Sequence, residues 1–336
     1  MSELLYLSAE DVAAVMRELD PVALMRQVLS LHAEGETVLP PEAYLSWTPP
    51  GGGSARSLGM PGQIGGRFNA VGTKIINANV DNPGRGLPRA SGLTILFDPV
   101  TARPACAMHA ALISATRTAA ISTAAAEQLR PSTGTTAALI GVGTIGRVHL
   151  DLIESHLPEL TEIAIYDDDR ERGRGLLGNG RTAGLSLAAS AEEAVRGASV
   201  VVTTTTTTTG YIPYEWLSPG AVLVHVSLDD ALPDVVEKAD LVLVDDWELV
   251  RDDPRRLLGR LYRAGKLHGP GEANGDGRAV DASIGEVMVG AHPGRSNDDE
   301  VILVNPFGMA IADIALAKEV YDGAHAAGLG VSLPFA

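Results

Sequence analysis

Cysteine is almost absent from this 336-residue sequence, and long hydrophobic runs are missing altogether. The single cysteine, Cys106, excludes a disulfide within the chain and a zinc site built from several cysteines. No apolar stretch approaches the roughly 18 to 20 residues that a membrane span needs. The first six residues lack the basic flank and apolar core of a signal peptide. We therefore expect a cytoplasmic globular protein with no membrane partner. Metal-ligand spacing is lacking too, because the eight histidines are scattered, and each is expected at the surface or at a helix end.

Positive charge is also scarce, since 26 basic and 42 acidic residues give a net charge of −16. This balance argues against a nucleic-acid partner, because phosphate binding needs a basic face. One window departs from it: from Arg56 to Arg117 there are seven basic and two acidic residues, a net charge of +5. A basic pocket in an acidic protein attracts anions. We therefore predict a small anionic substrate, with chance clustering of solvated arginines as the alternative.

Glycine, by contrast, is placed where a dinucleotide needs it. An apolar run, Thr136–Ile140, leads into Gly-x-Gly-x-x-Gly, and apolar residues at helical spacing follow. In such a strand–turn–helix unit, Gly141 permits the turn, Gly143 lets backbone N–H groups approach a pyrophosphate, and Gly146 lets the helix pack close to the strand. An ordinary glycine-rich surface turn is the alternative. The predicted cofactor contacts in this motif are Gly141, Gly143, Thr144, Ile145 and Gly146.

A carboxylate follows the next apolar run, Glu162–Tyr166. Asp167 lies 26 positions after Gly141, where it can accept hydrogen bonds from the adenosine ribose and repel the 2′-phosphate of NADP. We therefore predict NAD as the cofactor, with the nearby Arg170 and Arg172 weakening the preference.

Apolar runs alternate with helical stretches through the second half of the chain. Continuous apolar strands indicate burial on both faces and hence a parallel sheet, and the alternation indicates a doubly wound α/β domain. Thr203 and Thr204 come just after Val200-Val201-Val202 and are predicted to face the cofactor, because ligands bind at the carboxyl edge of such a sheet. A plain loop is the alternative for these threonines. The predicted strands are Thr136–Ile140, Glu162–Tyr166, Ser199–Thr206, Val222–Leu228, Leu241–Val244 and Val301–Val304.

The remainder of the chain predicts a mixed helix and strand segment. Ser8 and Asp11 form a capping-box pattern at the start of a helix. Short runs punctuated by Gly and Pro between residues 38 and 97 are typical of strands. The last helix is expected to return to the first domain. The predicted helices are Ser8–Met16, one that starts at Asp20-Pro21, Ala111–Leu129 and Met309–Ala327.

Two cationic side chains of the basic window are candidates for the chemistry. Lys74 lies in a strand pattern that carries it inward, where apolar neighbours would lower the pKa of its amine and suit it to general acid–base work. Arg117 stands in a helix of otherwise small residues, which leaves room for its guanidinium to grip a carboxylate. A surface arginine is the alternative for Arg117.

Four motifs of this chain, taken in their order along the sequence, resemble those of the ornithine cyclodeaminase/μ-crystallin family. They are Lys74, Arg117-Thr118-Ala119-Ala120, the glycine motif and Phe307-Gly308-Met309-Ala310, and the resemblance extends over essentially the whole chain. It implies a Rossmann-type NAD-binding domain at residues 117–308. This domain would be inserted into an α+β substrate-binding and dimerisation domain at residues 1–116 and 309–336. It also implies a homodimer.

By position, the resemblance implies roles for individual residues. Lys74 and Arg117 would bind the substrate carboxylate and transfer protons, with Arg56 as a second carboxylate contact. An aspartate after the fourth predicted strand acts in catalysis in the family, and both Asp229 and Asp230 are available. The remaining contacts that the resemblance implies are Phe307 for the substrate and Arg117, Thr118, Ser227 and Gly308 for the cofactor.

Several stretches are similar to one branch of the family, the N-(2-amino-2-carboxyethyl)-L-glutamate dehydrogenases. Ser227–Pro233 departs from the Gly-Gly-Asp-Cys-Pro-Gly-like segment of true cyclodeaminases. The branch implies NAD-dependent oxidative cleavage of that compound to L-2,3-diaminopropionate and 2-oxoglutarate, for siderophore or peptide-antibiotic biosynthesis. Its substrate carries three carboxylates, and Arg89 would pair with one that ornithine lacks. The stretches are Met60-Pro61, Ile64-Gly65-Gly66, Asp81-Asn82-Pro83, Arg89-Ala90-Ser91-Gly92, Val244–Trp247 and Asp298–Pro306.

The alternatives within the family are ornithine cyclodeamination, alanine dehydrogenation and ketimine reduction. A non-catalytic NAD(P)-binding protein of the μ-crystallin type is an alternative of another class. The presence of Lys74, Arg117 and two candidate aspartates counts against it, because a pure binding protein needs no proton-transfer groups.

Overall fold

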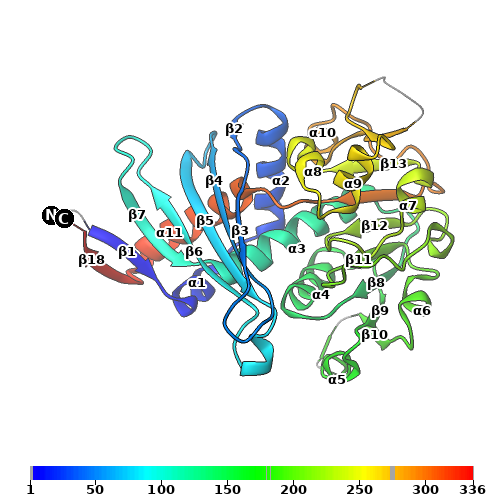
Figure 1. The fold of residues 1–336 in the computed structure, drawn as a ribbon, viewed down its shortest axis with the longest axis horizontal. Helices are drawn as coiled ribbons and strands as arrows, with labels where there is room; N and C mark the ends of the chain where they lie inside the picture. The colour runs from blue at the N-terminus through cyan, green and yellow to red at the C-terminus, as the bar shows by residue number, and fades with distance from the viewer. Residues whose placement is uncertain (1–2, 179, 182, 273–276, 336) are drawn as a thin grey trace. The chain divides into compact units, whose positions relative to one another are not determined.

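The chain divides into two compact units, one of which is interrupted by the other. The computed structural model describes residues 3–178, 180–181, 183–272 and 277–335 (Figure 1). The terminal unit comprises Met1–Arg117 and Met309–Ala336, and the Rossmann unit comprises Thr118–Gly308. The first boundary falls inside helix α3 (Ala110–Leu129), whose two ends therefore belong to different units.

The Rossmann unit is built on a parallel sheet of eight strands in the order β10-β9-β8-β11-β12-β17-β13-β16. All neighbouring pairs in this sheet run parallel, so the predicted doubly wound α/β fold is confirmed. The strand order reverses between β8 and β11, and in such sheets ligands bind at the carboxyl ends of the strands at this point. The elements are β8 (Thr136–Ile140), α4 (Thr144–His156), β9 (Glu162–Tyr166), α5 (Arg170–Arg174), β10 (Gly184–Leu187), α6 (Ala191–Val195), β11 (Val200–Thr203), η2 (Tyr214–Trp216), β12 (Val222–His225), α7 (Pro233–Lys238), β13 (Leu241–Val244), α8 (Trp247–Asp252), α9 (Leu257–Arg263), β14 (Leu267–His268), β15 (Arg278–Ala279), β16 (Ala282–Ser283), α10 (Ile284–Met288) and β17 (Ile302–Asn305).

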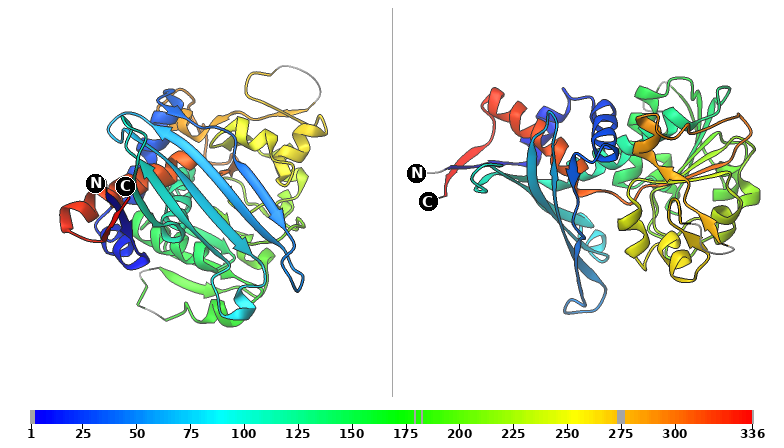
Figure 2. Two further views of the ribbon diagram at one scale, coloured as in Figure 1. Left: turned by 60° about the vertical axis from the view of Figure 1, so that its left-hand side comes forward. Right: turned by 90° about the horizontal axis from the view of Figure 1, so that it is seen from above.

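The terminal unit is a mixed sheet in the order β18-β1-β7-β6-β5-β4-β2, with β3 paired to β4. Figure 2 shows α1, α2 and α11 on the same side of this sheet. Gly62 allows α11 to pack close to β4, because a Cβ added there would lie 3.2 Å from the side chain of Ile311. The elements are β1 (Glu3–Leu7), α1 (Ala9–Met16), α2 (Pro21–Ala33), β2 (Thr37–Val38), β3 (Ala43–Trp47), β4 (Ala55–Ile64), β5 (Ala70–Asn79), η1 (Pro83–Arg85), β6 (Ala90–Phe97), β7 (Pro104–His109), α11 (Ala310–Ala327) and β18 (Val331–Pro334).

Local signals placed most helix starts correctly. Ser8 caps α1 and forms the predicted capping box with Asp11, and Asp20 caps α2 by accepting from the Ala23 N–H. Two strands end earlier than predicted: β11 stops at Thr203 and β12 at His225. Beyond these points the backbone leaves the sheet and forms loops, where polar side chains take over the hydrogen bonding.

The expectation that every histidine lies at the surface or at a helix end is wrong for two of them. His149 and His225 are fully buried. Burial lowers the pKa of His149 to about 4 and that of His225 to about 3, so both are neutral at physiological pH. Among the described residues, no helix combines the length and apolarity required to cross a bilayer.

Candidate active site

The glycine motif lies at the carboxyl end of β8, at the reversal of strand order. Gly141 has a φ of +88°, and its N–H donates to the carbonyl of Tyr166 at 2.8 Å. A Cβ on Gly146 would lie only 2.0 Å from the Gly141 carbonyl oxygen, whereas one on Gly143 would meet nothing within 4 Å. Gly143 is the N-cap of α4, where the first backbone N–H groups of the helix are free to bind an anion. Thr144 and Ile145 follow on the exposed first turn. The loop therefore has a surface that fits a pyrophosphate.

Asp167 is buried and already engaged by the protein. Its carboxylate accepts from the Val142 N–H at 2.8 Å and from the Asp169 N–H at 2.9 Å, and it forms an ion pair with Arg172 at 3.1 Å. It therefore shapes the glycine loop in addition to any contact with a ribose. Asp168, which the sequence reasoning missed, is exposed at the same strand end and accepts from the Tyr166 hydroxyl at 2.9 Å. The run of three aspartates after β9 was the available signal.

A buried polar network joins the ends of β11 and β12. The Asp230 carboxylate accepts from the hydroxyls of Thr205 at 2.8 Å, Tyr211 at 2.7 Å and Ser227. Ser227 also shares a hydrogen bond of 2.8 Å with Thr203, so two predicted cofactor residues belong to this network. Thr204 instead donates to the Gly141 carbonyl at 2.6 Å and ties the loop after β11 to the glycine motif.

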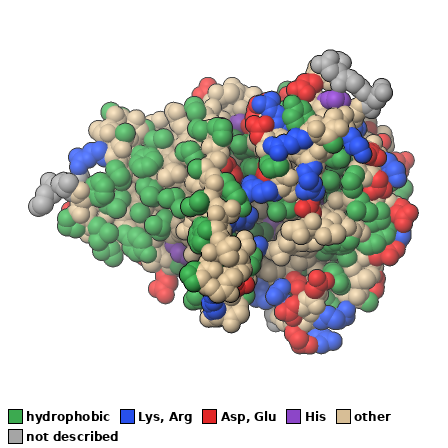
Figure 3. Space-filling model, in the orientation of Figure 1, with side chains coloured by type: hydrophobic (Ala, Val, Ile, Leu, Met, Phe, Trp, Pro, Cys, Tyr) green, Lys and Arg blue, Asp and Glu red, His purple; other side chains and the backbone are tan. Residues whose placement is uncertain are grey.

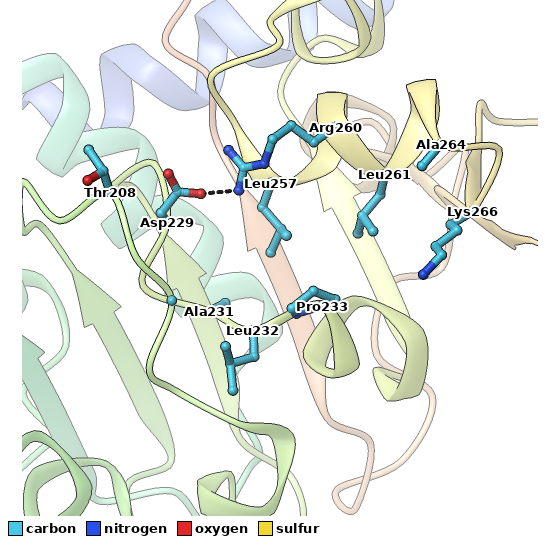
Figure 4. A pocket seen from close by; sticks show the side chains of 11 residues that line it. Thr208, Asp229, Ala231, Leu232, Pro233, Leu257, Arg260, Leu261, Ala264 and Lys266 are labelled. Atoms are coloured by element: carbon cyan, nitrogen blue, oxygen red, sulfur yellow. Dashed lines mark hydrogen bonds and ion pairs between the residues drawn. The ribbon is translucent and has the colours of Figure 1, made fainter.

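Asp229 and Asp230 have different surroundings. Asp229 forms an ion pair with Arg260 and lines a pocket of about 290 Å³ within the Rossmann unit (Figure 4). Apolar side chains such as Leu232 and Leu257 form much of its wall. Asp230 is fully buried, and its backbone N–H donates to the neutral ring of His225 at 3.0 Å. Both carboxylates remain candidates for the catalytic aspartate.

Phe307 and Gly308 follow β17 and are held by the carboxylate of Asp245, a residue of the Val244–Trp247 stretch for which no motif predicts a role. Asp245 accepts from the N–H groups of Phe307 and Gly308, each at 2.7 Å. Arg256 lies 4.5 Å from the Phe307 ring centre and donates to the Phe307 carbonyl at 2.9 Å. Gly308 has a φ of +103°, which a side chain would strain. The Phe307 ring therefore has a fixed position.

Within the terminal unit, Lys74 and Arg117 converge on one acidic side chain. Lys74 (β5) is buried, and its Nζ donates to Asp313 Oδ2 on α11 at 2.7 Å and to Ser114 Oγ at 3.3 Å. Arg117 Nε, from α3, lies 3.1 Å from the same carboxylate oxygen. Burial, followed by the charge of Arg117, lowers the pKa of Lys74 to about 8, which suits a group that exchanges protons near neutral pH.

Arg56 and Arg89 lie in the same unit. The register pairs Met60 with Lys74, so Arg56, four residues before Met60 on β4, shares the face of the sheet that carries Lys74. Arg89 precedes β6 and is exposed. Partial desolvation lowers the pKa of its guanidinium, and the nearby charge of Arg56 lowers it further. Two neighbouring cations of this kind favour an anion between them.

Thr118 is half-buried in α3, directly after Arg117 and on the other side of the boundary between the units. The predicted site residues thus form two groups. The Rossmann unit holds the glycine motif, the three aspartates after β9, the Asp230 network and the Phe307 segment. The terminal unit holds Lys74, Arg117, Arg56 and Arg89. The first group defines a dinucleotide-binding protein of the Rossmann class.

Comparison with known proteins places the chain more narrowly. Residues 4–328 match the model of the ornithine cyclodeaminase/mu-crystallin family, and the chain belongs to this family. It is 34% identical to the N-((2S)-2-amino-2-carboxyethyl)-L-glutamate dehydrogenase of Staphylococcus aureus, over 98% of both chains. The fold is similar to the crystal structure of CmnK, with a TM-score of 0.92, 40% identity and coverage of 100% of this chain and 99% of that one. An archaeal alanine dehydrogenase dimer with bound NAD gives a TM-score of 0.85 at 25% identity, with both chains covered completely.

The family prediction is therefore confirmed. At the level of the family, the comparisons also confirm an oxidoreductase that acts on the CH–NH bond of an amino acid and uses NAD.

Proposed function

We propose that this chain is an NAD-dependent dehydrogenase that converts N-(2-amino-2-carboxyethyl)-L-glutamate to L-2,3-diaminopropionate and 2-oxoglutarate. The observation that carries the choice of substrate is the pair of neighbouring guanidinium groups at Arg56 and Arg89, of which Arg56 lies on the face of the sheet that bears Lys74. A single cation suffices to bind the α-carboxylate of a simple amino acid, whereas a substrate with three carboxylates needs further cations. The 34% identical relative of that name supports the same choice.

NAD would be held by the glycine motif, with its pyrophosphate at the start of α4, and would accept a hydride from the glutamate Cα. Arg117 would grip the carboxylate next to that carbon through paired hydrogen bonds. Arg56 and Arg89 would bind the more distant carboxylates.

Lys74 would manage the protons of the reaction. Loss of the hydride converts the secondary amine to an imine, and water then adds to the imine carbon. The adduct collapses by breaking the C–N bond, which releases 2-oxoglutarate and the free amine of 2,3-diaminopropionate. Overall, one water is consumed and one proton is released for each NAD⁺ reduced. Either Lys74, with its lowered pKa, or the carboxylate of Asp229 or Asp230 would take the proton from the water.

The product amino acid would serve as a precursor of a siderophore or a peptide antibiotic. The assay that tests the proposal follows NADH formation with synthetic N-(2-amino-2-carboxyethyl)-L-glutamate, with ornithine and alanine as comparison substrates and with both products measured. The proposal requires a kcat/KM for the glutamate adduct at least tenfold above that for either comparison substrate. Equal or lower values would assign the enzyme to another activity of the family.

We also propose that the protein works as a homodimer through the terminal unit. The face of the terminal sheet opposite α11 is rich in exposed apolar side chains, which Figure 3 shows gathered over β1, β7 and β18. Ile75 and Leu93 are direct cross-strand neighbours on it, and so are Tyr6 and Val331. A continuous apolar face of this kind is typical of an interface. Light scattering of the Leu93→Lys variant tests this: a mass unchanged from the wild-type dimer, or a wild-type monomer, would refute the assignment.

A further inference from the structure

Helix α11 supplies a charged residue that no motif predicted. Asp313 is fully buried, although its neighbours along the helix, Ile311 and Ile314, belong to the apolar core. Its Oδ2 atom lies 2.7 Å from Lys74 Nζ and 3.1 Å from Arg117 Nε. Its second oxygen, Oδ1, is buried and has no hydrogen-bond partner among the described residues. One oxygen therefore serves two cations, and the other remains open to a donor from outside the chain.

The charges of this cluster do not balance without Asp313. Lys74, Arg117 and Asp313 come from three different elements and are all less than one-tenth exposed. The charges that act on Lys74 are those of Arg117 from α3, Asp313 from α11 and Glu42 from the segment before β3. Arg117 favours loss of the lysine proton, whereas Asp313 and the half-buried Glu42 oppose it. Removing Asp313 would leave two neighbouring buried cations, with Glu42 as the remaining negative charge named among the described residues that act on Lys74. Buried charges without a partner are strongly unfavourable.

We propose that Asp313 is the positioning residue of this site: it fixes the amine of Lys74 and the guanidinium of Arg117 against a single carboxylate oxygen and sets the charge state of Lys74. It acts through these two residues, and the reaction they serve is the one under Proposed function. The geometry is specific because the pair of contacts fixes the amine relative to the guanidinium. A neutral or shorter side chain at position 313 could not do this.

The titration of Lys74 tests the proposal without any substrate. The chain has only four lysines, Lys74, Lys238, Lys266 and Lys318. Protein labelled with ¹³C at lysine Cε therefore gives few signals, and the Lys74→Arg variant identifies that of Lys74. In the wild-type protein without ligand, the midpoint should lie near pH 8. The Asp313→Asn variant should lower it by about 1 to 3 units, which is the effect of removing an adjacent opposite charge. The Asp313→Glu variant should bring the Lys74 midpoint most of the way back to the wild-type value.

The matched control is Asp322→Asn, on the same helix. Asp322 is exposed and forms an ion pair with Lys318, so the control should change the titration of Lys318 and leave that of Lys74 in place. A Lys74 midpoint that stays unchanged in Asp313→Asn, or moves equally in Asp322→Asn, would overturn the proposal. If Asp313→Asn does not fold, Arg117→Met is the deciding variant. It must raise the Lys74 midpoint, because it removes the guanidinium charge that lowers the pKa of Lys74 and leaves Asp313 with Lys74 as its one cation; a lowered or unchanged midpoint would overturn the proposal.

The same variants give a second readout in turnover. Whether Lys74 must be protonated or neutral in the reaction, the limb of the kcat/KM profile that it controls should move to lower pH in Asp313→Asn. A loss of activity with an unmoved limb would indicate a merely structural role. If the enzyme does not turn over the glutamate adduct, the proposed function fails while the lysine titration still decides the role of Asp313.

Discussion

Alanine at Gly146 should destabilise the fold, whereas alanine at Gly143 should leave the fold intact and weaken cofactor binding. The two glycines are three residues apart in the same motif and undergo the same change of one methyl group. At Gly146 the added Cβ would lie 2.0 Å from the Gly141 carbonyl oxygen and 2.9 Å from Thr204 Oγ1. At Gly143 it would meet no protein atom within 4 Å.

The magnitudes follow from these contacts. A backbone oxygen in a tight turn cannot move aside cheaply, and overpacking costs about 1 to 3 kcal/mol. For a unit of roughly 150 to 250 residues this lowers Tm by roughly 2 to 12 °C. Gly143 has a φ of −66° and a ψ of −164°, which alanine adopts readily. The free energy of unfolding of Gly143→Ala should therefore differ from that of the wild type by less than about 0.5 kcal/mol. Alanine is a poorer N-cap than glycine, but it also makes the unfolded chain less flexible, and the two effects offset each other.

The affinity for the cofactor should change in Gly143→Ala. The methyl group of Gly143→Ala would occupy the surface on which the pyrophosphate is expected, so the Kd for NADH should rise at least tenfold, or about 1.4 kcal/mol. Thermal unfolding without ligand and titration with NADH by calorimetry measure both quantities on each variant. If Gly143→Ala binds NADH as tightly as the wild type, the pyrophosphate does not lie on this loop. If Gly146→Ala keeps the wild-type Tm, the packing argument fails.

Three further outcomes are expected. Asp168→Ser should raise kcat/KM with NADP⁺ relative to NAD⁺ more than Asp167→Ser does, because Asp168 is exposed whereas Asp167 is tied to Val142 and Arg172; the reverse order would restore Asp167 as the discriminating residue. Lys74→Ala should lower kcat by about 10²- to 10⁴-fold and remove the limb near pH 8 from the rate profile, with NADH affinity unchanged; near wild-type turnover would exclude it from proton transfer. Arg89→Ala should lower kcat/KM for the glutamate adduct by roughly 30-fold or more, the effect of a lost charge pair worth on the order of 2 kcal/mol, and leave any alanine oxidation intact; an equal loss on both substrates would place Arg89 outside substrate recognition.

The parts of the structure that follow local rules could be predicted from the sequence. The run into Gly141 marks β8 to the residue, and the same holds for β9 and β13, because buried parallel strands are continuous apolar runs between helices. The roles assigned to the glycines agree with the φ of Gly141, the open surface at Gly143 and the close approach at Gly146.

What could not be predicted depends on contacts between distant segments. Asp313 meets Lys74 across 239 positions of sequence, and no spacing rule connects them. The signal available was a single charge in the otherwise apolar stretch of residues 310–317, all of which is buried. The engagement of Asp167 by the glycine loop and the burial of His225 beneath Asp230 arise in the same way, from side chains that meet only after the sheet has formed.

The terminal unit is completed by α11 and β18, which follow its other elements by about two hundred residues. β1 pairs with β18, with Glu3 opposite Pro334, and α11 covers the sheet formed by the first hundred residues. During synthesis at roughly 5 to 20 residues per second, the N-terminal strands would wait on the order of 10 to 40 s for these partners while the intervening unit emerges. Through that interval Lys74 and Arg117 have no Asp313, and the apolar strands around them have no helix to cover them. Folding of the terminal unit therefore depends on α11 and β18. A chain truncated within α11 should have a folded Rossmann unit and an uncovered, aggregation-prone terminal sheet.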